Sequence, residues 1–313
     1  MLGLGTLLKY GLLVRRGIGG IGKGSLVQQQ TKTLRRLLQQ AKDTAFGRHY
    51  DFAALLSLAD AQLLDAYRQR VPMFDYDAIY DAWWHRMLKG EADVCWRGKV
   101  RNFSLSSGTS GAPTKYIPVS DEMLRSMRRT TIHMFAQSTT FGFPTSFYGG
   151  QFLMISSCTK MRPYEGGNDV WVGDVSGINA GRMPKWFENF YKPGQAIASL
   201  PTWEQRLEAI VKNARDWDIK LIAGIPSWVQ MMLEAVVSHY KLKNIHEIWP
   251  NLQAYTSGGV SFVPYRRRFE QLMGKPILYL DTYYTSEGSL ACQTRLDADR
   301  MPMELLMDNG IYF

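Results

Sequence analysis

Residues 219–257 read IKLIAGIPSWVQMMLEAVVSHYKLKNIHEIWPNLQAYTS, and the order of apolar segments in this stretch decides the fold. The short apolar runs at 219–225 and 252–257 are typical of strands that are buried on both faces. The segment between them starts at Pro226, a residue that favours the first turn of a helix. A strand, a helix and a second strand in this order predict two parallel strands joined by a crossover.

The same alternation extends to both sides of this unit. Residues 151–157 and 276–284 are further predicted strands. A helix is predicted after Pro201, where Thr202 and Gln205 have the spacing of a capping box. We therefore predict an α/β fold for residues 100–313, with mixed, largely parallel sheets flanked by helices.

The first 99 residues have a different pattern, which predicts a mainly helical region. Apolar residues recur at helical spacing over 25–44, 54–70 and 75–91. Residues 1–24 form an amphipathic start, whose apolar run is too short to span a bilayer and is followed, not preceded, by arginines. We expect no integral membrane span. Three alternatives stay open for residues 1–24: they dock on the domain, they fray, or they attach to the surface of a membrane.

The formal net charge of +9 raises the question of nucleic acid binding. The arginine clusters lie on separate amphipathic segments, and no zinc-finger or RNA-binding signature accompanies them, so we expect no nucleic acid partner. The positive charge also suits a polyphosphate ligand. The three cysteines are too widely spaced for a disulfide framework and predict a reducing compartment, the cytoplasm; they are Cys95, Cys158 and Cys292.

Polar, glycine-bearing stretches follow three predicted strands: 106–111 (SSGTSG), 257–259 (SGG) and 285–288 (TSEG). Because parallel sheets bind ligands beyond the carboxyl ends of their strands, we expect these loops to converge at one edge of one sheet. The first loop lacks the G-x-S-x-G spacing of a hydrolase elbow, and Lys115 is too far from Gly111 for a conventional P-loop. Its glycines, hydroxyls and Lys115 nevertheless provide the hydrogen-bond donors and the positive charge that phosphate needs. The structural alternative is that this stretch is only a solvated loop.

The third loop adds side chains that suit a nucleotide. Tyr283 offers a flat aromatic surface, Ser286 a hydroxyl and Glu287 a hard oxygen ligand for magnesium. The glycine pair of the second loop permits close approach of a flat ligand. Each feature has a structural alternative: Tyr283 as a core residue, and the loops as ordinary turns.

Taken together, these stretches resemble a known family. SSGTSGAPTK (106–115) and YYTSEG (283–288) are similar to the first two motifs of the Gretchen Hagen auxin-responsive acyl acid-amido synthetases, a group of adenylate-forming enzymes. The flanking segments GKVRNFSLSSGTS, LIAGIPSWV and LLMDNGIYF resemble its bacterial branch. The resemblance implies that residues 1–313 form the large N-terminal domain of an adenylate-forming enzyme.

The resemblance also implies an activity, its cofactors and its site residues. A small carboxylic acid attacks the α-phosphate of ATP to give an acyl-adenylate, and the amine of an amino acid then takes the acyl group to form an amide. ATP and Mg²⁺ are the implied cofactors, with Lys115, Ser286 and Glu287 as the catalytic residues and Glu287 as the magnesium ligand. The implied nucleotide-binding residues are Ser106, Ser107, Gly108, Thr109 and Ser110 at the phosphates, Ser257, Gly258 and Gly259 beside the adenine, Tyr283 stacked on it, and Ser286 at the α-phosphate.

The chain departs from this pattern at NGIYF (309–313), where it ends before the family's third motif and its small mobile C-terminal domain. We therefore expect weak ATP binding and little amide synthesis from these 313 residues. Two alternatives stay open: an acyl-CoA-type ligase that shares the adenylating half, and a non-catalytic relic that binds a nucleotide or an acyl acid. The helix predicted over 120–139 is placed to line an acyl pocket through Met134 and Phe135, which are equally suited to the core. The identity of the acid and the amine, and the oligomeric state, are not encoded in any motif of the sequence.

Overall fold

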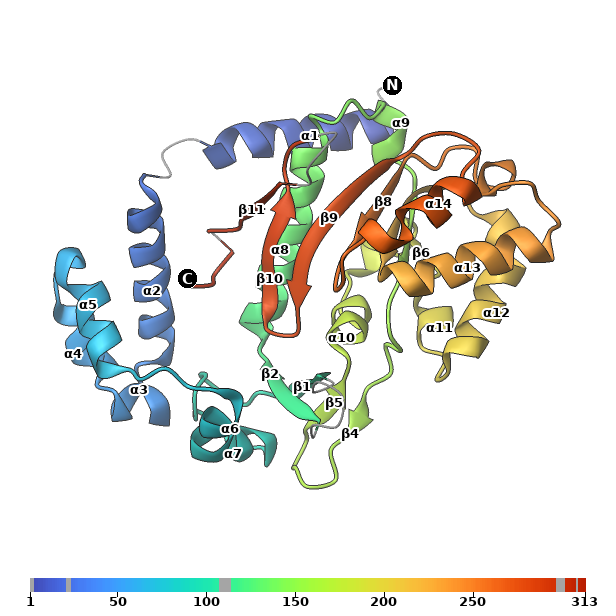
Figure 1. The fold of residues 1–313 in the computed structure, drawn as a ribbon. Helices are drawn as coiled ribbons and strands as arrows, with labels where there is room; N and C mark the ends of the chain where they lie inside the picture. The colour runs from blue at the N-terminus through green and yellow to red at the C-terminus, as the bar shows by residue number, and fades with distance from the viewer. Residues whose placement is uncertain (1–2, 21–23, 107–113, 297–301, 308) are drawn as a thin grey trace.

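A computed structural model describes residues 3–20, 24–106, 114–296, 302–307 and 309–313 (Figure 1). Its larger sheet has seven strands in the order β11-β10-β9-β8-β7-β3-β6. The strands β6, β3, β7, β8 and β9 run parallel, and β10 and β11 are antiparallel to their neighbours. Their bounds are β3 Gln151–Ile155, β6 Tyr191–Lys192, β7 Ile219–Gly224, β8 Ala254–Ser257, β9 Leu278–Thr285, β10 Gly288–Gln293 and β11 Met303–Leu305.

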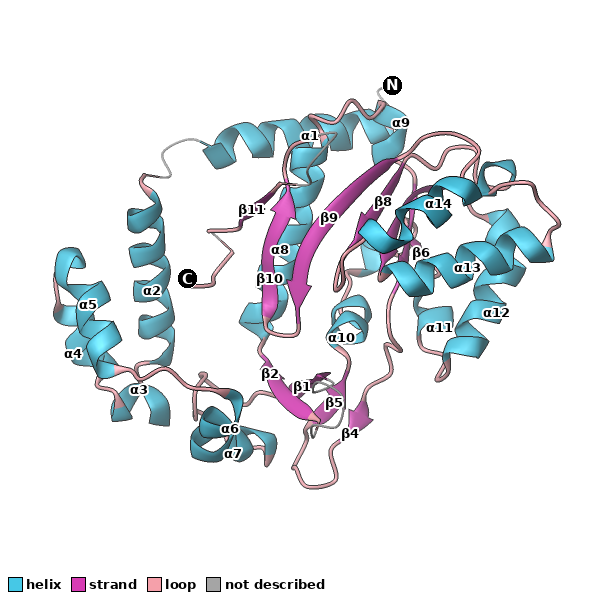
Figure 2. Cartoon of the chain, in the orientation of Figure 1, coloured by secondary structure: helices cyan, strands magenta, loops and turns pink. Residues whose placement is uncertain are grey.

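The predicted crossover is confirmed, because β7 leads through α13 (Pro226–His239) to the parallel neighbour β8. Helices α12 (Trp203–Asn213), α13 and α14 (Arg266–Leu272) pack on one face of the sheet over the largest apolar cluster, which includes Val229 and Trp249. Helix α8 (Asp121–Ser138) lies on the other face (Figure 2). Alternation along β9 accounts for this arrangement: Tyr279 packs against the first cluster, and the hydroxyl of Tyr284 donates to the sulfur of Met127 on α8 at 2.9 Å.

A second sheet has four strands in the order β2-β1-β5-β4. Strands β1 and β2 pair antiparallel, β1 and β5 are parallel, and β4 and β5 are antiparallel; the bounds are β1 Asn102–Ser106, β2 Lys115–Val119, β4 Arg162–Pro163 and β5 Trp171–Gly173. The expectation of three polar loops at the edge of one sheet is therefore wrong for the first loop. It connects two strands of the smaller sheet, because β1 returns directly into β2 instead of crossing over through a helix.

The N-terminal region is helical, as predicted, with α1 Leu4–Gly20, α2 Leu26–Ala41, α3 Ala45–His49, α4 Phe52–Ser57 and α5 Asp60–Arg70. The single helix predicted over 54–70 is two helices, separated by extended backbone at Leu58 and Ala59. Arg35 of α2 stabilises the break, since its guanidinium donates to the carbonyls of Leu56 (3.0 Å) and Leu58 (2.5 Å) and to the carboxylate of Asp60 (2.5 Å). A partner from another helix thus replaces hydrogen bonds that a continuous helix would have made internally.

The remaining elements connect these parts. The third predicted helix runs through α6 (Tyr76–Ile79), a π-helical segment (Tyr80–Trp84) and α7 (His85–Leu88). Short helices follow at α9 Thr145–Tyr148, α10 Val175–Gly181 and α11 Gln195–Ala198, with 3₁₀ turns at Lys185–Phe187, Ala214–Asp216, Ile245–Glu247 and Val263–Tyr265. Among the described residues, no helix has the length and apolar character needed to cross a membrane.

Candidate functional site

The hairpin between β9 and β10 carries the TSEG stretch at its tip. Ser286 and Glu287 form the two-residue turn, and the backbone N–H of Glu287 donates to the hydroxyl of Thr285 at 3.3 Å. A Cβ on Gly288 would lie 2.9 Å from Cδ1 of Ile311, so a larger residue does not fit at the start of β10. The turn therefore holds Glu287 exposed at the tip of the hairpin.

The second polar loop lies beside the middle of β9. Strand β8 ends at Ser257, which pairs with Asp281, and the hydroxyl of Thr282 donates to the carbonyl of Ser257 at 2.7 Å. A Cβ on Gly258 would lie 2.9 Å from that same hydroxyl, so glycine is required for this close approach. Tyr283 is next along β9 and is 52% exposed, which argues against the alternative that it is a core residue. The SGG loop and Tyr283 therefore lie at one edge of the larger sheet.

Asp281 is a half-buried carboxyl group that sequence reasoning missed. Burial raises the pKa of Asp281, and this is opposed by the nearby hydroxyl of Ser257 and the positive charge of Arg266. Ser257 itself is 1% exposed, so a ligand at this edge would meet the backbone of the two glycines before it met the Ser257 hydroxyl. An acidic residue at the end of the apolar run ILYLD was the signal in the sequence.

The first polar loop is described only at its two ends. Ser106, the last residue of β1, pairs directly with Lys115, the first residue of β2. Ser107, Gly108, Thr109 and Ser110 lie outside the described residues. The ammonium group of Lys115 lies 5.0 Å from the centre of the Tyr76 ring, whose hydroxyl in turn accepts a hydrogen bond from the backbone N–H of Tyr116 at 2.8 Å. This cation–π contact orients Lys115 at the start of β2.

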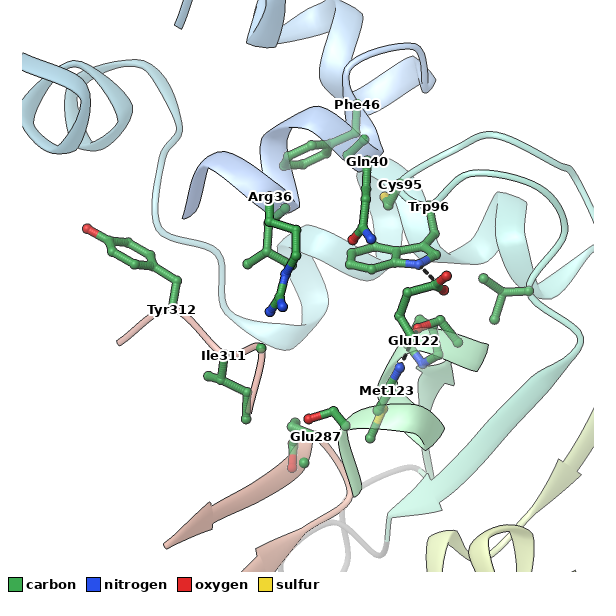
Figure 3. A pocket seen from close by; sticks show the side chains of 18 of the residues that line it. Arg36, Gln40, Phe46, Cys95, Trp96, Glu122, Met123, Glu287, Ile311 and Tyr312 are labelled. Carbon is green, nitrogen blue, oxygen red and sulfur yellow. Dashed lines mark hydrogen bonds between the residues drawn. The ribbon is translucent and has the colours of Figure 1, made fainter. Parts of the chain in front are cut away.

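A cavity of about 620 Å³ lies between α2, residues 95–100, the start of α8, the β9–β10 hairpin and residues 310–312. Figure 3 shows Arg36 extending into it from α2, with Glu287 across from it on the hairpin. The indole N–H of Trp96 donates to the carboxylate of Glu122 at 2.7 Å in its wall. Of the predicted site residues that the structure describes, Glu287 is the one that lines this cavity; its neighbours there include Ile117, Pro118, Ser120, Met123, Gly288 and Ile311.

Two arginines give this cavity a positive end. A Cβ on Gly310 would lie 3.0 Å from Nη2 of Arg36 and 3.7 Å from Nη2 of Arg129. Burial and the charge of Arg129 both lower the pKa of Arg36. Cys95 also lines the cavity, but burial raises the pKa of its thiol to about 12, so the thiol is protonated and is a poor nucleophile near neutral pH.

The residues that were candidates for an acyl pocket on α8 lie elsewhere. Phe135 packs against Phe152, with ring centroids 5.1 Å apart, in an apolar cluster beneath β3. Met134 is half-buried, and neither residue lines the cavity. Phe135 is therefore a core residue, which was the alternative to its lining an acyl pocket.

No group of three or more histidine, cysteine, aspartate or glutamate side chains that could hold a metal ion occurs among the described residues. Glu287 therefore offers an exposed carboxylate that belongs to no such group. This fits magnesium, which keeps several waters and is commonly bound through one or two carboxylates together with substrate phosphates.

Comparison with known proteins matches the chain to one family by its sequence and to solved synthetase structures by its fold. The sequence profile of the GH3 family N-terminal domain matches residues 24–197. The solved structure of the GH3.15 acyl acid amido synthetase superposes with a TM-score of 0.68 at 13% identity, over 90% of this chain and 57% of that one. The structure of the AtGH3.15 acyl acid amido synthetase in complex with 2,4-DB superposes with a TM-score of 0.67 at 14% identity, over 91% of this chain and 57% of that one.

A third solved structure, 2-hydroxyisobutyryl-CoA ligase in complex with 2-HIB-AMP and CoA, gives a TM-score of 0.49 at 13% identity, over 82% of this chain and 53% of that one. A search of curated proteins found no match. The chain thus spans 57% of the length of the synthetase structures that it matches.

Proposed function

The chain belongs to the GH3 family, and from this premise we propose that it is the adenylating part of an ATP-dependent acyl acid amido synthetase. It activates a small carboxylic acid as an acyl-adenylate with release of pyrophosphate, and the acyl group then passes to the amine of an amino acid. One observation carries the proposal. Glu287 of the second motif shares the wall of one cavity with residues that follow the first motif, although the two motifs are far apart in the sequence; these residues are Ile117, Pro118, Ser120, Glu122 and Met123.

The proposed nucleotide position follows the edge of β9. Tyr283 presents an exposed ring beside the SGG loop, and Glu287 lies four residues further along the chain, in the turn that follows β9. A nucleotide laid along this edge would place its base at Tyr283 and its phosphates at Ser286 and Glu287. The base would approach the backbone at Gly258 and Gly259, where no side chain obstructs it.

The proposed chemistry is electrostatic. Magnesium, when bound, neutralises phosphate charge and stabilises the leaving pyrophosphate. Glu287 supplies it with an exposed oxygen ligand, Ser286 supplies a hydroxyl donor, and Lys115 supplies a fixed positive charge opposite Ser106. The reaction needs no general base, because the attacking carboxylate is already ionised near neutral pH.

We assign the reaction to a reducing compartment, the cytoplasm. The three cysteines are free thiols, and burial raises the pKa of the Cys292 thiol to about 11, which protects it from oxidation.

Acid-dependent exchange of labelled pyrophosphate into ATP tests the proposal. We expect slow exchange by this chain that requires one member of a panel of carboxylic acids, and we expect Glu287→Gln to lower it by at least about tenfold, since one charged ligand is lost. Glu188→Gln is the matched control, because Glu188 is an exposed glutamate distant from the cavity lining. Exchange that needs no acid, or that is equal in the Glu287 variant and the wild type, would contradict the proposal. Incubating the acid and ATP with amino acids or with coenzyme A then distinguishes an amide product from a thioester.

A further inference from the structure

Helix α1 is fixed to the domain by one of its faces. The ammonium group of Lys9 donates to the carbonyl of Phe143 at 2.7 Å, and Nε of Arg16 donates to the side-chain oxygen of Gln137 at 3.0 Å. A Cβ on Gly5 would lie 2.2 Å from the carbonyl oxygen of Thr145, so the helix backbones approach closely there. These contacts at several turns hold α1 against α8 and α9 in a defined orientation.

The opposite face of α1 is apolar and has no partner among the described residues. Leu4 and Leu7 are each 56% exposed, and Tyr10 and Val14 are each 61% exposed. Their spacing of three to four residues places them on one stripe along the helix. Single exposed apolar residues are common, but a continuous stripe on a docked helix marks an interaction surface.

The charge around this stripe identifies what it meets. Helix α1 contains three basic residues and no acidic one, and two of the three, Lys9 and Arg16, donate to the docked side. Arg15 is exposed on α1 and makes no hydrogen bond or ion pair within the described ranges. Apolar side chains beside basic ones complement a surface of anionic headgroups over hydrocarbon.

The position of α1 leaves the candidate site free. In Figure 1 helix α1 lies along the top of the molecule, and the turn between β9 and β10 lies at the lower end of these two strands, away from α1. The strands of the larger sheet separate α1 from the β9–β10 turn, so a membrane or partner that contacts α1 does not cover the turn.

We propose that the outer face of α1 binds the surface of a membrane that contains anionic lipid, with the helix lying in the plane of the headgroups. Leu4, Leu7, Tyr10 and Val14 enter the interface, and Arg15 contacts lipid phosphate. This attachment is independent of the adenylating activity proposed above.

Co-sedimentation of the full chain with vesicles tests the proposal. We expect binding to phosphatidylcholine vesicles that contain about one-third phosphatidylserine, and much weaker binding to phosphatidylcholine alone. Leu7→Gln with Val14→Gln should lower the affinity about tenfold or more without a change of charge, because it removes two inserted side chains. Arg15→Gln should lower binding in dilute buffer and have a smaller effect at high salt, which screens the charge.

Met73→Gln is the matched control, since Met73 is fully exposed outside α1. All of these side chains are exposed, so circular dichroism and melting temperature should match the wild type. Leu4→Gln with Tyr10→Gln is a second apolar pair on the same stripe and should reproduce the loss. The proposal is overturned if the wild type does not sediment with anionic vesicles, or if both apolar pairs bind them as the wild type does. Concentration-dependent self-association that both pairs abolish, in a wild type that ignores vesicles, would assign the stripe to a second copy instead.

Discussion

The guanidinium groups of Arg36, on α2, and Arg129, on α8, meet beside Gly310 at the edge of the cavity. Neither group has an acidic partner among the residues that the structure describes, although Arg35 and Arg125, on the same helices, form ion pairs with Asp60 and Glu122. Two like charges held close together repel each other, and the pKa of Arg36, lowered by burial and by Arg129, reports this. The pair is a positive end of the cavity that the fold maintains at a cost in stability.

Replacing Arg129 with Gln should therefore stabilise the protein slightly in dilute buffer. We expect a gain of a few tenths of a kcal/mol, because the groups are partly exposed and water screens them. The gain should vanish in about 1 M salt, where the screening length is about 3 Å. Urea unfolding at two salt concentrations measures it. Arg128→Gln is the control, since Arg128 instead donates to the carbonyl of Arg182 at 3.0 Å; an equal gain in that variant would contradict the account.

A buried lysine makes Asp218 a pH-sensitive contributor to stability. Nζ of Lys220 lies 2.6 Å from the carboxylate of Asp218, and the Lys220 side chain is only 8% exposed. Burial alone would raise the pKa of Asp218, but hydrogen bonds from Lys220 and Asn251 outweigh it and lower the pKa. A carboxyl group with a lowered folded pKa stabilises the protein above its unfolded pKa of about 3.9, and this stabilisation is lost as the pH falls through the folded value.

Asp218→Asn should accordingly destabilise the protein near neutral pH by about 1–2 kcal/mol, since it leaves a buried ammonium group with a weaker partner. The difference from the wild type should begin to shrink below the unfolded pKa of about 3.9 and should close as the pH falls through the lower folded pKa, where the wild-type carboxyl becomes protonated. Unfolding free energies measured across this range show whether it does. Lys220→Met removes the buried charge itself and should be tolerated better near neutral pH; a larger loss in that variant would mean that the ion pair is not the cause.

The capping box of α12 gives a stability prediction away from the site. The hydroxyl of Thr202 accepts from the N–H of Gln205 at 3.2 Å, and the N–H of Thr202 donates to the side chain of Gln205 at 3.4 Å. Thr202→Ala should cost about 1 kcal/mol, or about 2 °C in melting temperature. Thr140→Ala, at the end of α8, removes a hydroxyl that caps no helix N-terminus and should cost less. Equal shifts in the two variants would show that the box contributes nothing particular.

Local signals in the sequence were enough to predict the larger sheet. Strands β7, β8 and β9 lie in short runs that are rich in apolar residues, and the helix between β7 and β8 begins at its proline, so composition and start signals agree. The smaller sheet could not be predicted in the same way, because the pairing of β1 with β2 and β5 depends on partners chosen over long range. The break at Leu58 likewise needs Arg35 from another helix, which no pattern within 54–70 contains.

Residues of the candidate site were predicted one by one from the sequence, but their layout was not. Tyr283, Gly258 and Glu287 were identified from the chemistry that a nucleotide needs. Glu287 lies at the cavity because α2 and the start of α8 close around the tip of the hairpin, and no pattern within 283–288 contains these partners. Arg36 was not identified, because it comes from the helical region and meets Arg129 only through the tertiary fold.

The affinity of the chain for a stable acyl-adenylate mimic, an acylsulfamoyl adenosine, tests the central claim most directly. We expect saturable binding in titration calorimetry for at least one acyl group, with Tyr283→Ala weakening it about tenfold because base stacking is lost. Trp186→Ala is the control, since Trp186 is an equally accessible aromatic side chain, 68% exposed, away from this edge. Binding that weakens in the Tyr283 variant and not in the Trp186 variant is the predicted result. No binding of any such mimic, or equal affinity in the wild type and the Tyr283 variant, would contradict a nucleotide site along β9.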